Sequence, residues 1–360
     1  MQVANKYIYD VLPYIPGKPI GEVKRALGLK SVIKLASNEN PYPPSPKVLA
    51  AMRKASLTVN RYPDGGCFEL RKAVAKYLKV QEDQLIFGNG SDEIIILAVK
   101  AFVGQGDEVI IAKPSFLIYD IAARLAGAKI HAVPLNNFYY DLDGMKAKLS
   151  NKTKIVFIGN PDNPAGTFVN GRQLEGFIKA ASVGTLIFID EAYFEYVHSK
   201  DYPNSIALIK KYPNVMVTRT FSKMYGLAGL RVGYGIARPE IVDILNRLRE
   251  PFNVNSIAQA AAVAAIGSQK YYQNIAKDVE RQRLYIYQAL SKLKVSYEQS
   301  FTNFILLKVG GNSSITAKAL LNKGVIIRDM GAWGLKGYIR VSIGTGAENK
   351  RFIKSLAEVL

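Results

Sequence analysis

Cysteine and histidine are scarce: the 360 residues include one cysteine and two histidines. Cys67 has no second cysteine with which to form an intramolecular disulfide, and such sparse usage is typical of a reducing compartment. His131 and His198 lie far apart in the sequence, and no cysteine cluster accompanies them. We therefore expect neither a histidine-based metal site nor a serine-type catalytic triad.

Long apolar runs are also missing. No run approaches the roughly 20 residues that a membrane-spanning helix needs. The best candidate, Ile257–Ile266, is short and contains Gln259. The N-terminal stretch MQVANKYIYDVLPYIPGK lacks the basic segment and following apolar segment of a signal peptide. We therefore expect a cytoplasmic protein that does not enter the membrane.

Acidic residues are few in comparison with basic ones. The chain has 48 Lys and Arg against 29 Asp and Glu, a formal net charge of +19. A nucleic-acid-binding protein without catalytic activity would explain such a charge, and it stays open as an alternative of another class. The basic residues are scattered along helical faces, however, and form no block typical of a binding tail. A solvated surface that attracts anionic small molecules is the preferred interpretation.

What the chain does contain is enough apolar sequence for a full core. Hydrophobic residues make up 49% of it, and its length favours two domains. Strand candidates alternate with helical patterns and lie at residues 108–112, 129–133, 154–158, 185–189, 215–219 and 231–237. This alternation predicts an α/β fold with a mostly parallel central sheet covered by helices on both faces. After Pro251, long helical stretches at 256–293 precede three further strand candidates, which predicts a smaller α+β domain.

The segment Val215–Gly235 carries the strongest chemical signal. It reads as a buried strand, a polar turn and a second strand. The hydroxyls of Thr220 and Ser222 and the guanidinium of Arg231 can hold a phosphate. Lys223 can form a Schiff base with an aldehyde. Taken alone, the segment could also be an ordinary surface loop with common basic residues.

Two other turns follow apolar runs. Gly88–Glu93 precedes a helical pattern, and a glycine-rich turn that opens a helix presents free N–H groups and the positive end of the helix dipole to a phosphate. Ser91 or Asp92 could instead be a plain N-cap. Asn160–Gly166, with the sequence NPDNPAG, forms a rigid turn at the carboxyl end of a strand, where open α/β sheets bind ligands.

Asp190 stands directly after the apolar run at 185–189 and begins the motif DEAYFEY. A carboxylate in that position is partly buried and needs a partner. It could keep a pyridine nitrogen protonated, and the phenol of Tyr193 could hydrogen-bond a phenolate oxygen on the same ring.

These motifs, in this order, resemble those of the fold type I pyridoxal 5′-phosphate aminotransferases. More narrowly, the chain is similar to the histidinol-phosphate aminotransferases over nearly its whole length. The segments that carry the resemblance are ASNENPYPPSP, NRYPDGGCFELRKAVAKYL, RTFSKMYGLAGLRVGYG and YIRVSIGT. Departures are Asp162 and Ala165, where the family often has Asn and Thr, Pro43 in place of a common Gly, and Phe116 in place of a usual Tyr. The resemblance implies a large cofactor-binding domain at 38–250 and a small domain formed by 1–37 and 251–360.

The resemblance also implies roles for individual residues. Lys223 would hold the pyridoxal 5′-phosphate and move the proton, Asp190 would pair with the pyridine nitrogen, and Tyr193 and Asn163 would contact the ring oxygen. Phe116 would stack on the ring. The phosphate would be bound by Ser91, Asp92, Thr220, Ser222 and Arg231, and by Tyr62 from the other subunit of a homodimer. Arg340 and Arg328 would bind the acidic groups of the substrates.

The function that the resemblance implies is an amino-group transfer. L-Histidinol phosphate and 2-oxoglutarate would be converted to imidazole acetol phosphate and L-glutamate, in histidine biosynthesis, by a ping-pong mechanism. Two activities of the same family remain open: an aromatic amino-acid aminotransferase and a threonine-phosphate decarboxylase would use the same machinery.

Overall fold

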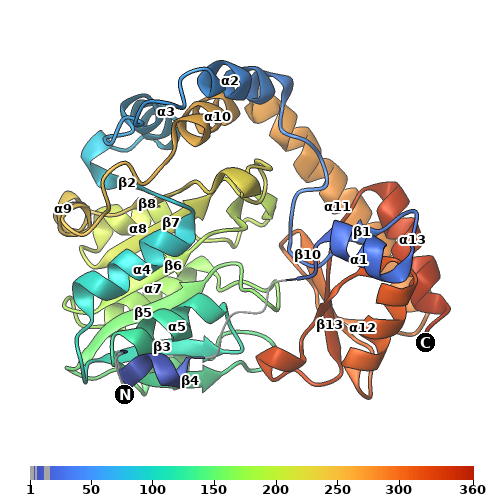
Figure 1. Cartoon of the computed structure of the whole chain (residues 1–360). Coiled ribbons are helices and arrows are strands. Elements are labelled where there is room, and N and C mark those ends of the chain that lie inside the picture. Colours follow the sequence, from blue (N-terminus) through green and yellow to red (C-terminus); the bar gives the residue numbers. More distant parts are fainter. Residues whose placement is uncertain (1–3, 5, 12–16) are drawn as a thin grey trace.

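The computed structural model describes residues 4, 6–11 and 17–360. A broad sheet covered by helices occupies one side of the molecule, and a smaller helix-covered sheet occupies the other (Figure 1). Within the described residues, no helix combines the length and apolar composition needed to cross a membrane.

The broad sheet has seven strands in the order β2-β8-β7-β6-β5-β3-β4. Their bounds are Leu85–Gly88 (β2), Glu108–Lys113 (β3), Lys129–Pro134 (β4), Thr153–Gly159 (β5), Leu186–Asp190 (β6), Val215–Thr220 (β7) and Gly233–Ile236 (β8). β3 to β7 pair in parallel, and β8 runs antiparallel to both of its neighbours. The six predicted strands and the mostly parallel sheet are confirmed. The last strand is shorter than predicted because Arg231, with a φ of 54°, lies before it in a left-handed turn.

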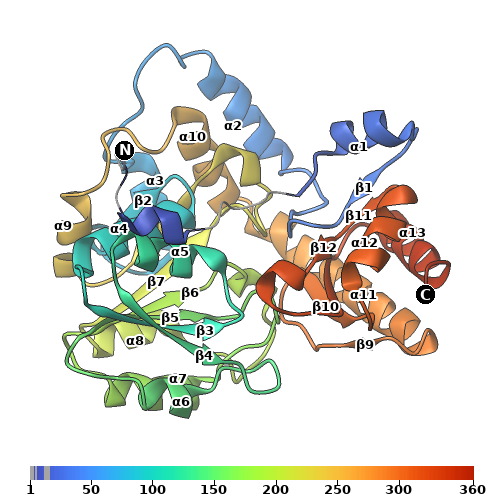
Figure 2. The ribbon, with the colours of Figure 1, turned by 60° about the horizontal axis from the view of Figure 1, so that its bottom comes forward.

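Helices cover both faces of this sheet (Figure 2). Along β5, Ile155 and Phe157 belong to one apolar cluster, and Val156 and Ile158 belong to the other. Because successive side chains point to opposite faces, a strand buried on both sides needs a continuous apolar run. The covering helices are α4 (Ser91–Phe102), α5 (Leu117–Leu125), α6 (Leu142–Lys146), α7 (Gly171–Ala180), α8 (Ser205–Lys211) and α9 (Pro239–Asn246).

The smaller sheet has four strands in the order β12-β13-β10-β9. They are β9 (Ser296–Tyr297), β10 (Phe304–Lys308), β12 (Arg328–Asp329) and β13 (Tyr338–Ser342). The accompanying helices are α11 (Gln269–Lys292), α12 (Ser313–Asn322) and α13 (Gly346–Ala357). Two of the three strands predicted after Pro251 are confirmed as β10 and β13, whereas the candidate at 324–329 is divided between β12 and a strand of a separate two-stranded sheet. The helical pattern predicted at 256–293 is confirmed, with a break at residues 267–268.

The N-terminal part of the chain contacts both halves of the molecule. A short 3-10 helix at Lys6–Asp10 lies against α5, whereas β1 (Ile33–Lys34), which follows α1 (Ile20–Leu27), pairs in parallel with β11 (Val325–Ile326). Helices α2 (Pro46–Ser56) and α3 (Phe68–Leu78) pack against α10 (Ser256–Ile266). Residues 1–3, 5 and 12–16 of the predicted N-terminal segment lie outside the described residues. The division at residues 37 and 250 stays a prediction.

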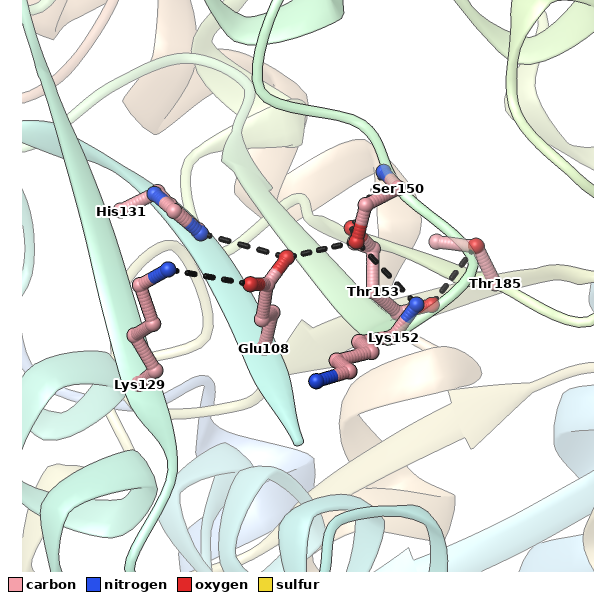
Figure 3. Close-up of polar contacts among 7 residues, drawn as sticks. All are labelled: Glu108, Lys129, His131, Ser150, Lys152, Thr153 and Thr185. Atoms are coloured by element: carbon pink, nitrogen blue, oxygen red, sulfur yellow. Dashed lines mark hydrogen bonds and ion pairs between the residues drawn. The ribbon is translucent and has the colours of Figure 1, made fainter. Parts of the chain in front are cut away.

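The two ends of the strands in the broad sheet differ in chemistry. At the amino ends of the strands, Glu108 accepts hydrogen bonds from Ser150 Oγ (2.6 Å) and Lys129 Nζ (3.2 Å), and its Oε2 lies 3.3 Å from His131 Nε2 (Figure 3). The Ser150 hydrogen bond above all lowers the pKa of this carboxyl to about 2, so it is ionised at neutral pH. At the carboxyl ends of the strands, called the carboxyl edge of the sheet below, β3, β5, β6 and β7 all end beside one cavity. Ligands of open α/β sheets bind at that edge.

Candidate active site

The cavity at the carboxyl edge has a volume of about 330 Å³. Residues from both sheets and from the N-terminal segment line it. It brings together all the predicted site residues except one: Ser91, Asp92, Phe116, Asn163, Asp190, Tyr193, Thr220, Ser222, Lys223, Arg231, Arg328 and Arg340.

An anion-binding corner forms where α4 begins. Gly90 precedes the helix with a φ of 84°, and a Cβ there would lie 2.5 Å from Arg231 Nη2, so only glycine fits the turn. No side chain caps the first turn, which leaves its N–H groups free to face an anion. Arg231 donates to Asp92 Oδ2 (3.2 Å) and Ser222 Oγ (3.4 Å), which fixes its guanidinium beside that turn.

Lys223 comes directly after Ser222, whose hydroxyl belongs to this corner. Thr220 ends β7, and its Oγ1 accepts a hydrogen bond from the Ser222 N–H at 3.1 Å, which bends the chain sharply. Lys223 then lines the cavity, with Nζ 5.6 Å from the centre of the Tyr193 ring. The turn therefore puts a primary amine beside two hydroxyls and a guanidinium.

Asp190 is the buried carboxyl of the cavity. It is 6% exposed and accepts hydrogen bonds from the Tyr119 hydroxyl (2.7 Å), the Ala192 N–H (3.1 Å) and Thr218 Oγ1 (3.4 Å). Loss of hydration raises its pKa to about 6, although the Tyr119 hydrogen bond opposes the shift. The carboxyl is thus mostly ionised at neutral pH, and its negative charge favours a cationic group in the cavity.

Tyr119 was not identified from the sequence. It lies in α5, where a buried aromatic residue is indistinguishable from core, and its ring stacks on Phe157 at 4.6 Å. Phe116 caps the start of the same helix, lines the cavity and meets Tyr119 edge-on at 5.6 Å. The loop after β3 thus supplies an aromatic wall through Phe116, and the helix that follows it supplies Tyr119, the partner of Asp190.

Asn38 is a second residue that sequence reasoning missed. Its Nδ2 donates to the Tyr193 hydroxyl (2.9 Å), and its own N–H donates to Ser342 Oγ (2.8 Å). Asn38 adopts a φ of 55°, a left-handed conformation that asparagine tolerates better than most residues. A signal was present, since Asn38 lies in the motif ASNENPYPPSP, where a polar residue before several prolines marks a fixed turn.

Arginines close the side of the cavity that faces the smaller sheet. Arg340, 5% exposed, donates to Asn163 Oδ1 and, at 3.3 Å, to the Ala36 carbonyl. Arg328 packs its guanidinium 5.5 Å from the Trp333 ring, and Trp333 also lines the cavity. Trp333 was missed because a lone aromatic residue between glycines reads as an exposed turn.

Tyr62 is the predicted site residue that lies outside the cavity. It is 83% exposed, and its ring stacks on Phe252 with 4.7 Å between centroids. Its predicted role concerns the cavity of another subunit, so its exposed position in a single chain leaves that prediction open.

Metal chemistry finds no support around the cavity. Across residues 4, 6–11 and 17–360, no group of three or more His, Cys, Asp or Glu could hold a metal ion. The cavity instead combines an amine, a buried carboxyl, an anion-binding corner and two guanidiniums. That set suits an anionic, carbonyl-bearing cofactor together with an acidic substrate.

Comparisons with known proteins agree with this chemistry. Residues 30–356 match the family model of aminotransferase class I and II. A histidinol-phosphate aminotransferase from Moorella thermoacetica is 45% identical over 354 residues, which cover 98% of this chain and 92% of the relative. A histidinol-phosphate aminotransferase from Caldicellulosiruptor saccharolyticus is 43% identical over 357 residues, 99% of each chain.

Solved structures show the same fold. The histidinol-phosphate aminotransferase from Sinorhizobium meliloti, in complex with pyridoxal-5′-phosphate, superposes with a TM-score of 0.92 at 28% identity and covers 100% of this chain and 98% of its own. The aspartate aminotransferase from Thermus thermophilus with maleate gives 0.87 at 20% identity over 100% of both chains, a likeness of fold alone. The predicted fold type I architecture is confirmed. The chain belongs to the class I and II aminotransferases.

Proposed function

We propose that the protein transfers an amino group between L-histidinol phosphate and 2-oxoglutarate, giving imidazole acetol phosphate and L-glutamate, in histidine biosynthesis. Pyridoxal 5′-phosphate is its cofactor. The observation that carries the proposal is the meeting of Lys223, Asp190 and the α4 anion-binding corner in one cavity. The names of the relatives at 45% and 43% identity support this choice of substrate.

The residues present fit the cofactor group by group. The α4 N-terminus, Thr220, Ser222 and Arg231 suit its phosphate, and Lys223 suits its aldehyde. Asp190 suits the pyridine nitrogen. Asn163 and Tyr193, which also line the cavity, suit the ring oxygen, and Phe116 suits the face of the ring. When bound, the cofactor supplies an electron sink for the electron pair left behind as the α-proton departs.

The protein's own side chains have separate roles in the reaction. Asp190, held by Tyr119, keeps a proton on the ring nitrogen through its negative charge. Lys223 is the base in the cavity that can take the proton from the substrate α-carbon and return it to a neighbouring carbon. Tyr193, whose hydroxyl accepts a hydrogen bond from Asn38, places its ring beside the lysine amine.

Arg340 and Arg328 explain how one cavity takes two different acids in turn. A guanidinium fork accepts a carboxylate or a phosphate monoester with the same geometry. Two such forks favour a doubly charged phosphate, which favours the phosphate-bearing donors, histidinol phosphate and threonine phosphate, over aromatic amino acids. Aromatic amino acids offer a single carboxylate to the same pair.

A homodimer in the cytoplasm completes the proposal. Large apolar side chains are exposed around the turn between α2 and α3: Leu57 at 81%, Val59 at 60% and Phe68 at 58%, with Tyr62 among them. A second copy of the chain would cover this surface and receive the Tyr62 hydroxyl at its own cofactor phosphate. The single cysteine, Cys67, is buried and unpaired, which suits a reducing compartment.

A panel of amino donors tests the proposed activity. The purified protein is loaded with pyridoxal 5′-phosphate, and the cofactor spectrum is followed after addition of histidinol phosphate, glutamate, phenylalanine or threonine phosphate. We expect histidinol phosphate and glutamate to convert the cofactor, and Lys223→Ala to abolish both conversions. Conversion by phenylalanine but not by histidinol phosphate would identify an aromatic aminotransferase, and release of carbon dioxide from threonine phosphate would identify a decarboxylase.

A further inference from the structure

Asp162 is a fully buried carboxyl that none of the proposed steps uses. It lies in the turn Asn160–Gly166 after β5 and has 0% exposure. Its Oδ1 accepts hydrogen bonds from the Tyr140 hydroxyl (3.2 Å) and Ser115 Oγ (3.3 Å), and its Oδ2 accepts one from the Ala165 N–H (3.2 Å). Neither Asp162 nor Ser115 lines the cavity.

These contacts tie two loops together behind the cavity wall. Ser115 belongs to the loop after β3 and immediately precedes Phe116, whereas Asp162 immediately precedes Asn163. Phe116 and Asn163 both line the cavity. The Tyr140 hydroxyl reinforces the connection because it also accepts from the Gly159 N–H (2.8 Å), at the end of β5. A single carboxyl therefore joins the backbone that carries Phe116 to the backbone that carries Asn163.

Keeping this carboxyl buried is unfavourable. Loss of hydration raises the pKa of Asp162 to about 7, and the Ala165 N–H and the two hydroxyls offset only part of that shift. The ionisable groups that feel its charge are Tyr140 and Tyr119, whose own pKa values lie well above their usual range, so both stay neutral donors. Arg340 donates a hydrogen bond to Asn163 Oδ1. An asparagine would fill the same volume without a charge. Costly groups of this kind are kept where a site needs a fixed geometry.

We propose that Asp162 is a positioning residue, whose carboxyl fixes the placement of Phe116 relative to Asn163 on the cavity wall. The inference rests on the proposed function, because Phe116 and Asn163 need a fixed relative position only if both contact the cofactor ring. Asp162 acts through its neighbours and touches neither cofactor nor substrate.

The test measures the dissociation constant of pyridoxal 5′-phosphate for the wild-type apoprotein and for Asp162→Ala, Asp162→Asn and Ser115→Ala. Asp162→Ala loses all three hydrogen bonds, and we expect about tenfold weaker binding. Asp162→Asn keeps the volume and can still bridge both loops, so it should recover most of the affinity. Ser115→Ala should weaken binding by about threefold in the wild-type background and have no further effect in Asp162→Ala, because the pair acts as one unit.

Glu108 provides a matched control. It is also a buried carboxyl that accepts a hydrogen bond from a serine hydroxyl (Figure 3). Glu108 is the first residue of β3, whereas Ser115 lies in the loop after the last residue of that strand. Glu108→Ala should lower thermal stability while leaving the cofactor affinity of the folded protein unchanged. An equal loss of affinity in Glu108→Ala and Asp162→Ala would show general loosening and would overturn the inference.

Other outcomes are equally decisive. Asp162→Ala binding within about twofold of the wild type would overturn the inference while leaving the proposed function intact. If Asp162→Ala fails to fold, Ser115→Ala and Asp162→Asn decide, and unchanged affinity in Ser115→Ala overturns the inference. A wild-type protein that binds no pyridoxal 5′-phosphate would instead remove the proposed function itself.

Discussion

Arg328 and Arg340 lie directly opposite each other in the antiparallel register of β12 and β13, and both line the cavity. Like charges at directly opposite positions of a strand pair are destabilising unless an opposite charge lies between them. The Arg328 guanidinium lies 5.5 Å from the centre of the Trp333 ring, and the Arg340 guanidinium lies 5.1 Å from the centre of the Phe304 ring. The arrangement is understandable if an acidic substrate binds between the arginines.

The two arginines should therefore contribute unequally to the two substrates. Arg340→Gln should raise KM for both glutamate and histidinol phosphate by about ten- to a hundred-fold, because one charged hydrogen-bond donor is lost. Arg328→Gln should raise KM mainly for histidinol phosphate, whose one acidic group is a phosphate with three acceptor oxygens that two guanidiniums can share. Steady-state kinetics with each substrate varied in turn measure both effects. Equal increases in Arg328→Gln would contradict the assignment.

Asp190→Asn should separate cofactor binding from catalysis. The substitution keeps the side-chain volume and can still meet Tyr119, but it removes the charge that we propose holds a proton on the ring nitrogen. Turnover should fall by several orders of magnitude while the cofactor still attaches to the protein. Stopped-flow recording of the first half-reaction, with the cofactor content measured in parallel, checks both parts. Near-normal turnover would make Asp190 a structural residue.

Asp162 should make stability depend on pH in a predictable direction. Its folded pKa of about 7 exceeds the ordinary value of 3.8, so the folded state binds this proton more tightly than the unfolded state. The contribution to the free energy of unfolding is fully present below about pH 4 and is lost as the pH rises through about 7. Asp162→Asn cannot ionise, so its stability relative to the wild type should increase over that interval by a few kcal/mol, as an order of magnitude.

Urea unfolding of the two apoproteins at several pH values measures this difference. The buried carboxyls of Asp190 and Glu195, whose pKa values are also raised by burial, are shared by both proteins and cancel in the comparison. A stability difference that does not change with pH would show that folding leaves the pKa of Asp162 at its unfolded value, and would contradict the prediction.

Tyr62→Phe should weaken cofactor binding if the hydroxyl reaches a partner subunit. The loss of one charge-assisted hydrogen bond, about 1.5–3 kcal/mol, corresponds to roughly a ten- to a hundred-fold lower affinity. Mixed dimers of Tyr62→Phe and Lys223→Ala chains should regain activity, because one of their two sites would carry neither defect. Tyr139→Phe, at another exposed tyrosine, serves as the control and should bind normally. No regain after confirmed subunit exchange would show that Tyr62 does not act between subunits.

Strands and turns were predictable because their signals are local. The continuous apolar run at 154–158 fits the observed β5, since both faces of the strand are buried. Asp190 could be placed at a strand end because it follows such a run directly, and Lys223 could be placed in the turn that follows the run at 215–219. The phosphate-binding role of the turn before α4 could be proposed for the same reason.

Pairings between distant segments could not be predicted in this way. The partner of Asp190 is Tyr119, 71 positions away, and the partner of Tyr193 is Asn38, 155 positions away. Neither pairing leaves a periodic pattern, because tertiary packing alone brings the segments together. Asp162 could be noted only as a departure from the family pattern. Its two hydroxyl partners, Ser115 and Tyr140, come from two other loops, so neither its burial nor its hydrogen bonds leave a local signal in the sequence.

The central claim is that Lys223 carries the cofactor, and borohydride reduction followed by peptide mapping tests it most directly. Reduction fixes an amine-linked pyridoxal group to the chain, so the label should appear on the peptide that contains Lys223, in about one equivalent per chain. Lys223→Ala should fold normally, take no label and lose transamination by several orders of magnitude. Stoichiometric label on a different lysine of the wild-type protein, or full labelling of Lys223→Ala, would contradict the assignment.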